Sequence, residues 1–322
     1  MSARLLAVLC LALLPSAAPA QLEAFNEQPI VDGKDVIWVP TPNAAVDRML
    51  LLARVTPNDV VVDLGSGDGK IVIAAAKRFG ARARGIEYSP DLVETSRRNA
   101  RIDGVADRTR FVQGDMFEAD FRDATVVTLY LLTTLNLKLR PKLLDMKPGT
   151  RVVSHVFRMG DWEPDETAKT GSSELYLWVV PARVAGRWRV DVRDGAKFEL
   201  ALDQRYQRVT GKVSGGSPAP LLRDVRLGGS EIRLALAGAG GERALTGRVD
   251  GDRIEGAERA DPRLQSARRG ARGAALLPQR PLLAGVFRHE PGDQRRRRRG
   301  VLPGARDADG GAERVAPRAS RA

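Results

Sequence analysis

The stretch VVVDLGSGDGK, residues 60–70, decides the fold. Its first three residues are β-branched and suit a buried strand, and the glycines that alternate after Asp63 permit a tight turn. The next segment, KIVIAAAKRF, has the pattern of a helix that ends at Gly80. A strand, a glycine-rich turn and a helix in this order predict the start of an α/β domain.

The same alternation continues toward the C-terminus. Further helices are expected over 90–104 and 135–149, with an earlier one starting near Pro42. The remaining strands of this part are expected at 81–89, 109–116, 124–132, 150–157 and 173–181. Alternating strands and helices predict a doubly wound, Rossmann-like parallel sheet with helices on both faces.

From Gly186 the pattern changes. Residues 186–256 alternate apolar and polar positions between glycine turns, which predicts a small antiparallel β module. Residues 257–322 have no periodicity and hold 16 Arg, no Lys and 7 acidic residues, which is +9 of the net charge of +12. We expect this tail to be disordered; contact with nucleic acid or acidic lipid and a shifted reading frame remain alternatives.

The first twenty residues have the layout of a secretory signal peptide. Arg4 precedes an apolar run, and Ala18-Pro19-Ala20 resembles a cleavage site. Residues 21–37 are a lead-in to the domain expected over 38–185. This layout predicts a periplasmic or cell-envelope protein; a cytoplasmic or membrane-anchored one is the alternative. The single cysteine, Cys10, lies in this leader, so the mature chain is expected to contain no disulfide or thiolate metal site.

Three kinds of glycine loop compete for residues 63–70. A phosphate-binding P-loop requires Ser or Thr after Gly69-Lys70, but Ile71 follows. A dinucleotide loop requires two residues between its second and third glycines, but only Asp68 separates Gly67 from Gly69. The D-x-G-x-G-x-G spacing is instead that of a loop packed against S-adenosylmethionine, whose positive charge suits Asp63.

Two further acids end the following strands. Glu87 closes the second strand, where a carboxylate can accept both hydroxyls of a ribose. Asp115 closes the third and is expected to take the adenine amino group, with Met116 against the ring. Carboxyl ends of parallel strands share one edge of a sheet, so these acids and Asp63 predict a nucleoside site. The predicted cofactor-binding residues are Thr41, Asp63, Gly65, Ser66, Gly67, Asp68, Gly69, Glu87, Asp115 and Met116.

In this glycine loop, the chain resembles the class I methyltransferases. The segments VPTP (39–42), TVVTLYLLTTLNLKLRPKLL (125–144) and KPGTRVVSHVFRMGDW (147–162) resemble, more narrowly, archaeal and bacterial protein-lysine methyltransferases related to the mitochondrial enzyme that acts on the c-subunit of ATP synthase. The resemblance covers about residues 38–182. It implies S-adenosylmethionine-dependent N-methylation of a protein lysine. A small-molecule methyltransferase and an exported non-catalytic binding protein are the alternatives.

Methyl transfer from a sulfonium is an in-line displacement that needs alignment of donor and acceptor and exclusion of water. We therefore expect no metal. Separately, we expect no specific nucleic-acid partner. Tyr130, after the fourth strand, and His155, at the end of the fifth, are the catalytic candidates. Each also has a structural alternative, as has Trp162, which either closes over the substrate or packs on the sheet. Thr41 either reaches the methionine moiety or caps a helix.

Overall fold

The computed structural model describes residues 39–191, 197–216, 218–238, 241–259 and 284–289. The predicted leader, the lead-in segment and most of the predicted tail lie outside these residues.

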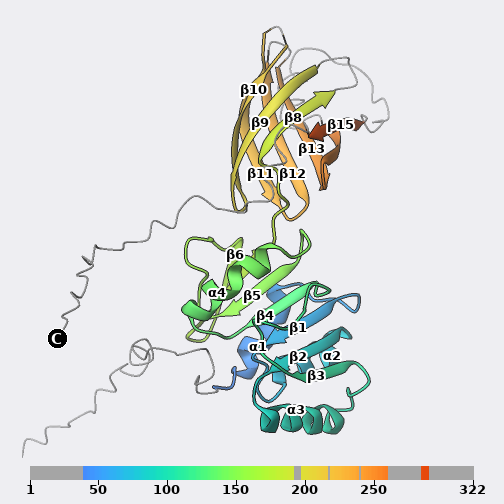
Figure 1. Ribbon diagram of the computed structural model, residues 1–322, viewed down its shortest axis with the longest axis vertical. Helices are drawn as coiled ribbons and strands as arrows, with labels where there is room; N and C mark the ends of the chain where they lie inside the picture. The colour runs from blue at the N-terminus through green and yellow to red at the C-terminus, as the bar shows by residue number, and fades with distance from the viewer. Residues whose placement is uncertain (1–38, 192–196, 217, 239–240, 260–283, 290–322) are drawn as a thin grey trace, which may run out of the picture. The chain divides into compact units, whose positions relative to one another are not determined.

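A seven-stranded sheet forms the first part of the described chain, with strand order β3-β2-β1-β4-β5-β7-β6 (Figure 1). Its strands are β1 (Val60–Leu64), β2 (Arg82–Glu87), β3 (Thr109–Gln113), β4 (Val126–Leu129), β5 (Arg151–His155), β6 (Glu166–Thr170) and β7 (Ser173–Val179). β1 to β5 pair in parallel, whereas β7 is antiparallel to both β5 and β6. The predicted α/β class is confirmed, and β6 is a strand that the sequence analysis did not expect.

The two faces of this sheet carry separate apolar cores. One core packs the sheet against α1 (Asn43–Leu52), α2 (Lys70–Phe79) and α3 (Pro90–Ile102). The other packs it against α4 (Thr133–Leu144) and the connection between β3 and β4. Val61 faces the first core and Val62 the second, so β1 is buried on both faces as a central parallel strand should be. No helix of the described residues is long and apolar enough to cross a membrane.

A buried ion pair fixes the amino end of β1. Asp59 is 5% exposed and accepts hydrogen bonds from Thr56, from Thr125 and from the guanidinium of Arg151. Burial alone raises the pKa of Asp59, but the hydrogen bonds from Thr125 and Thr56 and the charge of Arg151 hold it below its usual value. The aspartate therefore ties β1 to the starts of β4 and β5.

A second, all-antiparallel sheet follows, with strand order β10-β9-β8-β15-β14-β13-β12-β11. Its strands are β8 (Gly186–Asp191), β9 (Lys197–Arg205), β10 (Arg208–Ser214), β11 (Leu221–Gly228), β12 (Glu231–Gly238), β13 (Gly241–Asp250), β14 (Arg253–Arg259) and β15 (Ala284–His289). Alternate positions of its strands build one apolar cluster that includes Trp188, Leu200 and Ile254. The antiparallel module predicted from Gly186 is therefore present.

Two segments beyond the predicted end of this module at residue 256, in the part expected to be disordered, are strands. β14 extends to Arg259, and β15 at 284–289 pairs on one side with β14 and on the other with β8. A six-residue strand between Arg-, Gly- and Pro-rich segments has too little alternation to be recognised locally. Pairing with two neighbouring strands, rather than its own sequence, makes it a strand.

Candidate functional site

The backbone amides of the glycine loop are already hydrogen-bonded to the protein. Gly65 and Ser66 donate to the carbonyl of Ile86 at 2.8 and 3.1 Å, and Gly67 donates to Glu87 Oε2 at 2.8 Å. Gly69 donates to the carbonyl of Ser66 at 2.9 Å. A phosphate loop presents such amides to its ligand. Their engagement here agrees with the exclusion of both phosphate-binding loops from the sequence.

The loop requires glycine for space as well as for conformation. Gly69 has φ of +80°, and a Cβ there would lie 2.7 Å from the ring of Phe111 and 2.9 Å from Ser96 Cβ. Helix α3 holds the loop from this side, because Ser96 Oγ donates to the carbonyl of Gly67 and Asn99 Nδ2 to that of Asp68. Sequence analysis missed Ser96 and Asn99, which are polar positions on an otherwise ordinary helix.

Three other predicted residues lie around this loop in different roles. The side chain of Ser66 packs against β2 so closely that a Cβ on Gly85 would clash with its Oγ. Asp68 Oδ1 accepts from the amide of Lys70 at the start of α2. Thr41 is 8% exposed, and its carbonyl accepts from Lys70 Nζ at 3.2 Å. Helix α1 has no side-chain cap, so the alternative role of Thr41 as a helix cap is not observed.

Glu87 stands at the junction of the loop and β2. Its Oε2 accepts from Gly67 and its Oε1 accepts from the amide of Ser89 at 3.0 Å. A carboxylate has about four lone-pair sites, so two remain after these bonds. The side chain is half-buried and held in one orientation, as expected of a group that accepts two ribose hydroxyls.

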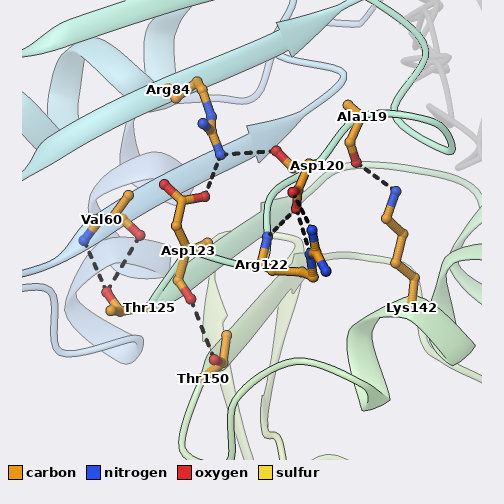
Figure 2. Close-up of polar contacts among 10 residues, drawn as sticks. Val60, Arg84, Ala119, Asp120, Arg122, Asp123, Thr125, Lys142 and Thr150 are labelled. Carbon is orange, nitrogen blue, oxygen red and sulfur yellow. Dashed lines mark hydrogen bonds and ion pairs between the residues drawn. The ribbon is translucent and has the colours of Figure 1, made fainter.

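Asp115 and Met116 lie in the connection between β3 and β4. Hydrogen bonds and an ion pair join later residues of this connection to the rest of the domain (Figure 2). Arg84 donates to the carbonyl of Asp120 and pairs with Asp123, and Lys142 of α4 donates to the carbonyls at 117 and 119. Asp115 Oδ1 accepts from the amide of Phe117 at 2.8 Å. The loop that carries the predicted adenine contacts is thus fixed by β2 and α4.

Asp63 is buried at the carboxyl end of β1, with 3% of its surface exposed. Thr128 of β4, which sequence analysis missed, donates a hydrogen bond to its Oδ1 at 2.5 Å. Burial raises the pKa of Asp63 to about 8; the bond from Thr128 opposes this shift, and the nearby charges of Glu87 and Asp68 add to it. The carboxyl is therefore neutral at pH 7. A cation beside it would lower its pKa and favour the ionised form.

Tyr130 and His155, predicted from different strands, lie together at the ends of β4 and β5. Their ring centroids are 4.2 Å apart, and the ring of Phe157 stacks on that of Tyr130 with 6.0 Å between centroids. His155 is 2% exposed, and burial lowers its pKa to about 4, so the imidazole is neutral. Phe157 is a third ring that the sequence analysis did not single out.

Trp162 does not cover this group of rings. It is fully buried, lies 6.0 Å from Trp178 and 5.9 Å from Tyr206 by ring centroids, and donates from its indole to Gln207. Of its two predicted roles, packing on the sheet is the one observed.

Residues 63–166 match the family described as the ANTKMT methyltransferase domain. A protein-lysine N-methyltransferase of Saccharolobus islandicus (strain REY15A) is 44% identical over 151 residues, which cover 45% of this chain and 94% of that protein. The chain belongs to this methyltransferase family. The predicted class of S-adenosylmethionine-dependent methyltransferase, and its resemblance to the lysine enzymes, are thereby confirmed.

Two further relatives match this chain over different shares of their own length. The ATP synthase c-subunit lysine N-methyltransferase of Xenopus laevis is 34% identical over 142 residues, 44% of this chain and 62% of that protein. A crystal structure described as an RNA methyltransferase from Salinibacter ruber in complex with S-adenosyl-L-homocysteine is 56% identical, with a TM-score of 0.45 over 45% of this chain and 96% of that one.

The site of the methyltransferase fits S-adenosylmethionine. Gly65 has φ of +74° and carries no side chain, Glu87 retains acceptor sites, and a cation beside the neutral carboxyl of Asp63 would favour its ionised form. Glu87 would hold the ribose, Asp115 and Met116 the adenine, and Asp63 the positively charged methionine part. When bound, the cofactor supplies an activated methyl group.

Replacing Glu87 by Ala should weaken S-adenosylmethionine binding by about 1–3 kcal/mol, because the ribose hydroxyls lose their acceptor and Gly67 loses its partner. Isothermal titration calorimetry measures the change. Glu94→Gln, on the exposed pair with Arg97 in α3, is the matched control and should leave the affinity unchanged. Equal affinities for Glu87→Ala and the wild type would contradict the ribose assignment.

Asp63 should make the ligand-free protein less stable as the pH rises. The folded state keeps its proton up to about pH 8, whereas the unfolded chain loses it near pH 3.8, so the folded state binds more protons between these values. The contribution of Asp63 to the free energy of unfolding therefore falls as pH increases through this window. Between about pH 5 and about pH 8, the free energy of unfolding measured with urea should decrease less for Asp63→Asn than for the wild type. An identical decrease in both proteins would exclude this role.

Proposed function

We propose that the protein transfers the methyl group of S-adenosylmethionine to the ε-amine of a protein lysine. The observation that carries the proposal is the uncharged group of three rings, Tyr130, His155 and Phe157, at the carboxyl ends of β4 and β5. These ends lie at the same edge of the sheet as Asp63 and the glycine loop. The names of the Saccharolobus and Xenopus relatives support the choice of lysine as acceptor.

An uncharged acceptor site suits the chemistry. A lysine attacks only as the neutral amine, yet in water its pKa is about 10.4. Removal from water disfavours the ammonium form, and a carboxylate beside the amine would favour it. Tyr130 and neutral His155 supply polar atoms without adding a negative charge. Burial raises the pKa of Tyr130, which keeps its hydroxyl protonated.

Incubating the purified protein with methyl-labelled S-adenosylmethionine and a lysate tests the acceptor class. Label should enter the protein fraction and, after hydrolysis, appear as methylated lysine. Tyr130→Phe should lower the rate of labelling by about tenfold or more while leaving cofactor affinity unchanged, because the ring remains and only the hydroxyl is lost. Label confined to small molecules or to nucleic acid would overturn the lysine proposal. Absence of all cofactor binding would favour a non-catalytic binding protein.

We also propose that the protein acts in the periplasm or cell envelope, on the strength of the leader-like composition of residues 1–20. Fractionation of cells that express the chain with a C-terminal tag should recover it in the envelope or periplasmic fraction, shortened by about 20 residues by mass spectrometry. Recovery of the uncleaved chain in the cytoplasm would contradict this location.

A further inference from the structure

The chain turns back sharply where β5 ends. Val156 has φ of +66°, a conformation that is an outlier for a β-branched residue. The amide of Phe157 donates to the carbonyl of His155 at 2.8 Å, two residues away, so Val156 is the central residue of a γ-turn with positive φ, which is a rare and strained form. Such strain persists only where the surroundings over-determine it, and it is concentrated at functional sites.

Polar groups from three elements hold this turn in place. The amide of Val156 donates to the carbonyl of Glu174 in β7 at 2.7 Å. Ser154 Oγ donates to the carbonyl of Phe157 at 2.8 Å. Asn136 of α4 is fully buried, and its Nδ2 lies 3.3 Å from the same carbonyl and 3.4 Å from that of Arg158. The strained turn is thus a fixed part of the fold rather than a loose loop.

Two buried side-chain atoms beside this turn, His155 Nδ1 and Asn136 Oδ1, have no hydrogen-bond partner among the described residues. The other ring nitrogen, His155 Nε2, lies 2.8 Å from Ser173 Oγ. Buried polar atoms are almost always paired, and an exception needs an explanation. The imidazole is 2% exposed and lies against the ring of Tyr130, inside the group of rings assigned to the acceptor.

We propose that His155 Nδ1 is the acceptor atom that receives an N–H of the incoming primary amine, and that Ser173 and Val156 are positioning residues for it. Ser173 accepts the Nε2–H, which leaves the lone pair on Nδ1. The turn at Val156 fixes the ring beside Tyr130. This inference rests on the proposed function and names how that site recognises its amine.

This arrangement serves methyl transfer without a charged base. A neutral amine has two N–H donors and one lone pair, so holding one N–H limits the directions in which the lone pair can point. A neutral imidazole makes this bond and favours the ammonium form less than a negatively charged carboxylate would. No covalent bond to His155 forms or breaks.

Nitrogen-15 NMR of the full chain labelled in histidine tests the tautomer directly, since the chain contains only two histidines, His155 and His289. His155→Asn assigns the signals, because it removes those of the His155 ring and leaves those of His289. We expect His155 to be neutral at pH 7, with the proton on Nε2. Added n-butylamine, in the presence of S-adenosylhomocysteine, should shift the Nδ1 signal. A proton on Nδ1 in the resting protein would overturn the proposal.

Two amide variants separate the roles of the ring nitrogens. The side-chain amide of Asn reaches the place of Nδ1, and that of Gln reaches the place of Nε2. His155→Asn should therefore retain more labelling of lysate protein than His155→Gln, which should lose about tenfold or more in rate, the effect of one hydrogen bond. Equal rates for both variants would overturn the assignment to Nδ1. Unchanged cofactor affinity by calorimetry shows that each variant is folded.

Ser173 provides a control on positioning. Ser173→Ala should mix the two neutral tautomers of His155 in the NMR spectrum and raise the KM for the acceptor, and Ser173→Thr should restore both. A single unchanged tautomer in Ser173→Ala would contradict the role of Ser173. Failure of the wild type to methylate lysate protein would instead remove the proposed function, while the tautomer of His155 remains measurable in the resting protein.

Discussion

The hydrogen bond from the Gly67 amide to the Glu87 carboxylate joins the glycine loop to the carboxyl end of β2, and the rest of the nucleoside site depends on it. Together with the bonds from Gly65 and Ser66 to the carbonyl of Ile86, it holds the glycine loop against the end of β2. The same bond orients the carboxylate that is expected to hold the ribose. It also occupies the Gly67 amide, and the bonds of Gly65, Ser66 and Gly69 occupy three more, so these amides are not free to bind a phosphate.

Burial gives the centre of the site two ionisable groups that are neutral near pH 7. Desolvation raises the pKa of Asp63 and lowers that of His155, so neither carries a charge in the ligand-free protein. Asp59, at the other end of β1, has the opposite character, because Arg151 and two threonines stabilise its charge. The two ends of one strand thus differ. An ion pair stabilises the charged aspartate at the amino end, whereas the aspartate at the carboxyl end is uncharged until a cation binds beside it.

Helix α4 links the acceptor side of the site to the second sheet. Asn136 holds the turn after β5, and Arg140, one helical turn later, donates to the carbonyl of Met159 and pairs with Asp161. Asp161 also binds Arg205 and Tyr206 at the β9–β10 turn. The MGDW segment, residues 159–162, is therefore joined through Arg140 to the helix that also holds the acceptor turn. This gives the second sheet a structural connection to the site.

Local pattern was enough for the strand, loop and helix order from Val60 to Ile102 and for the acids at the strand ends, because alternation, helix periodicity and glycine spacing are properties of neighbouring residues. Only the tertiary structure showed that Thr128, Ser96 and Asn136 complete the site. Their partners lie 65, 29 and 21 residues away along the chain. The same reason explains β15, which pairing with β14 and β8 makes a strand. A contact between distant residues leaves no local periodicity, so the sequence determined which groups are present, and folding decided which of them meet.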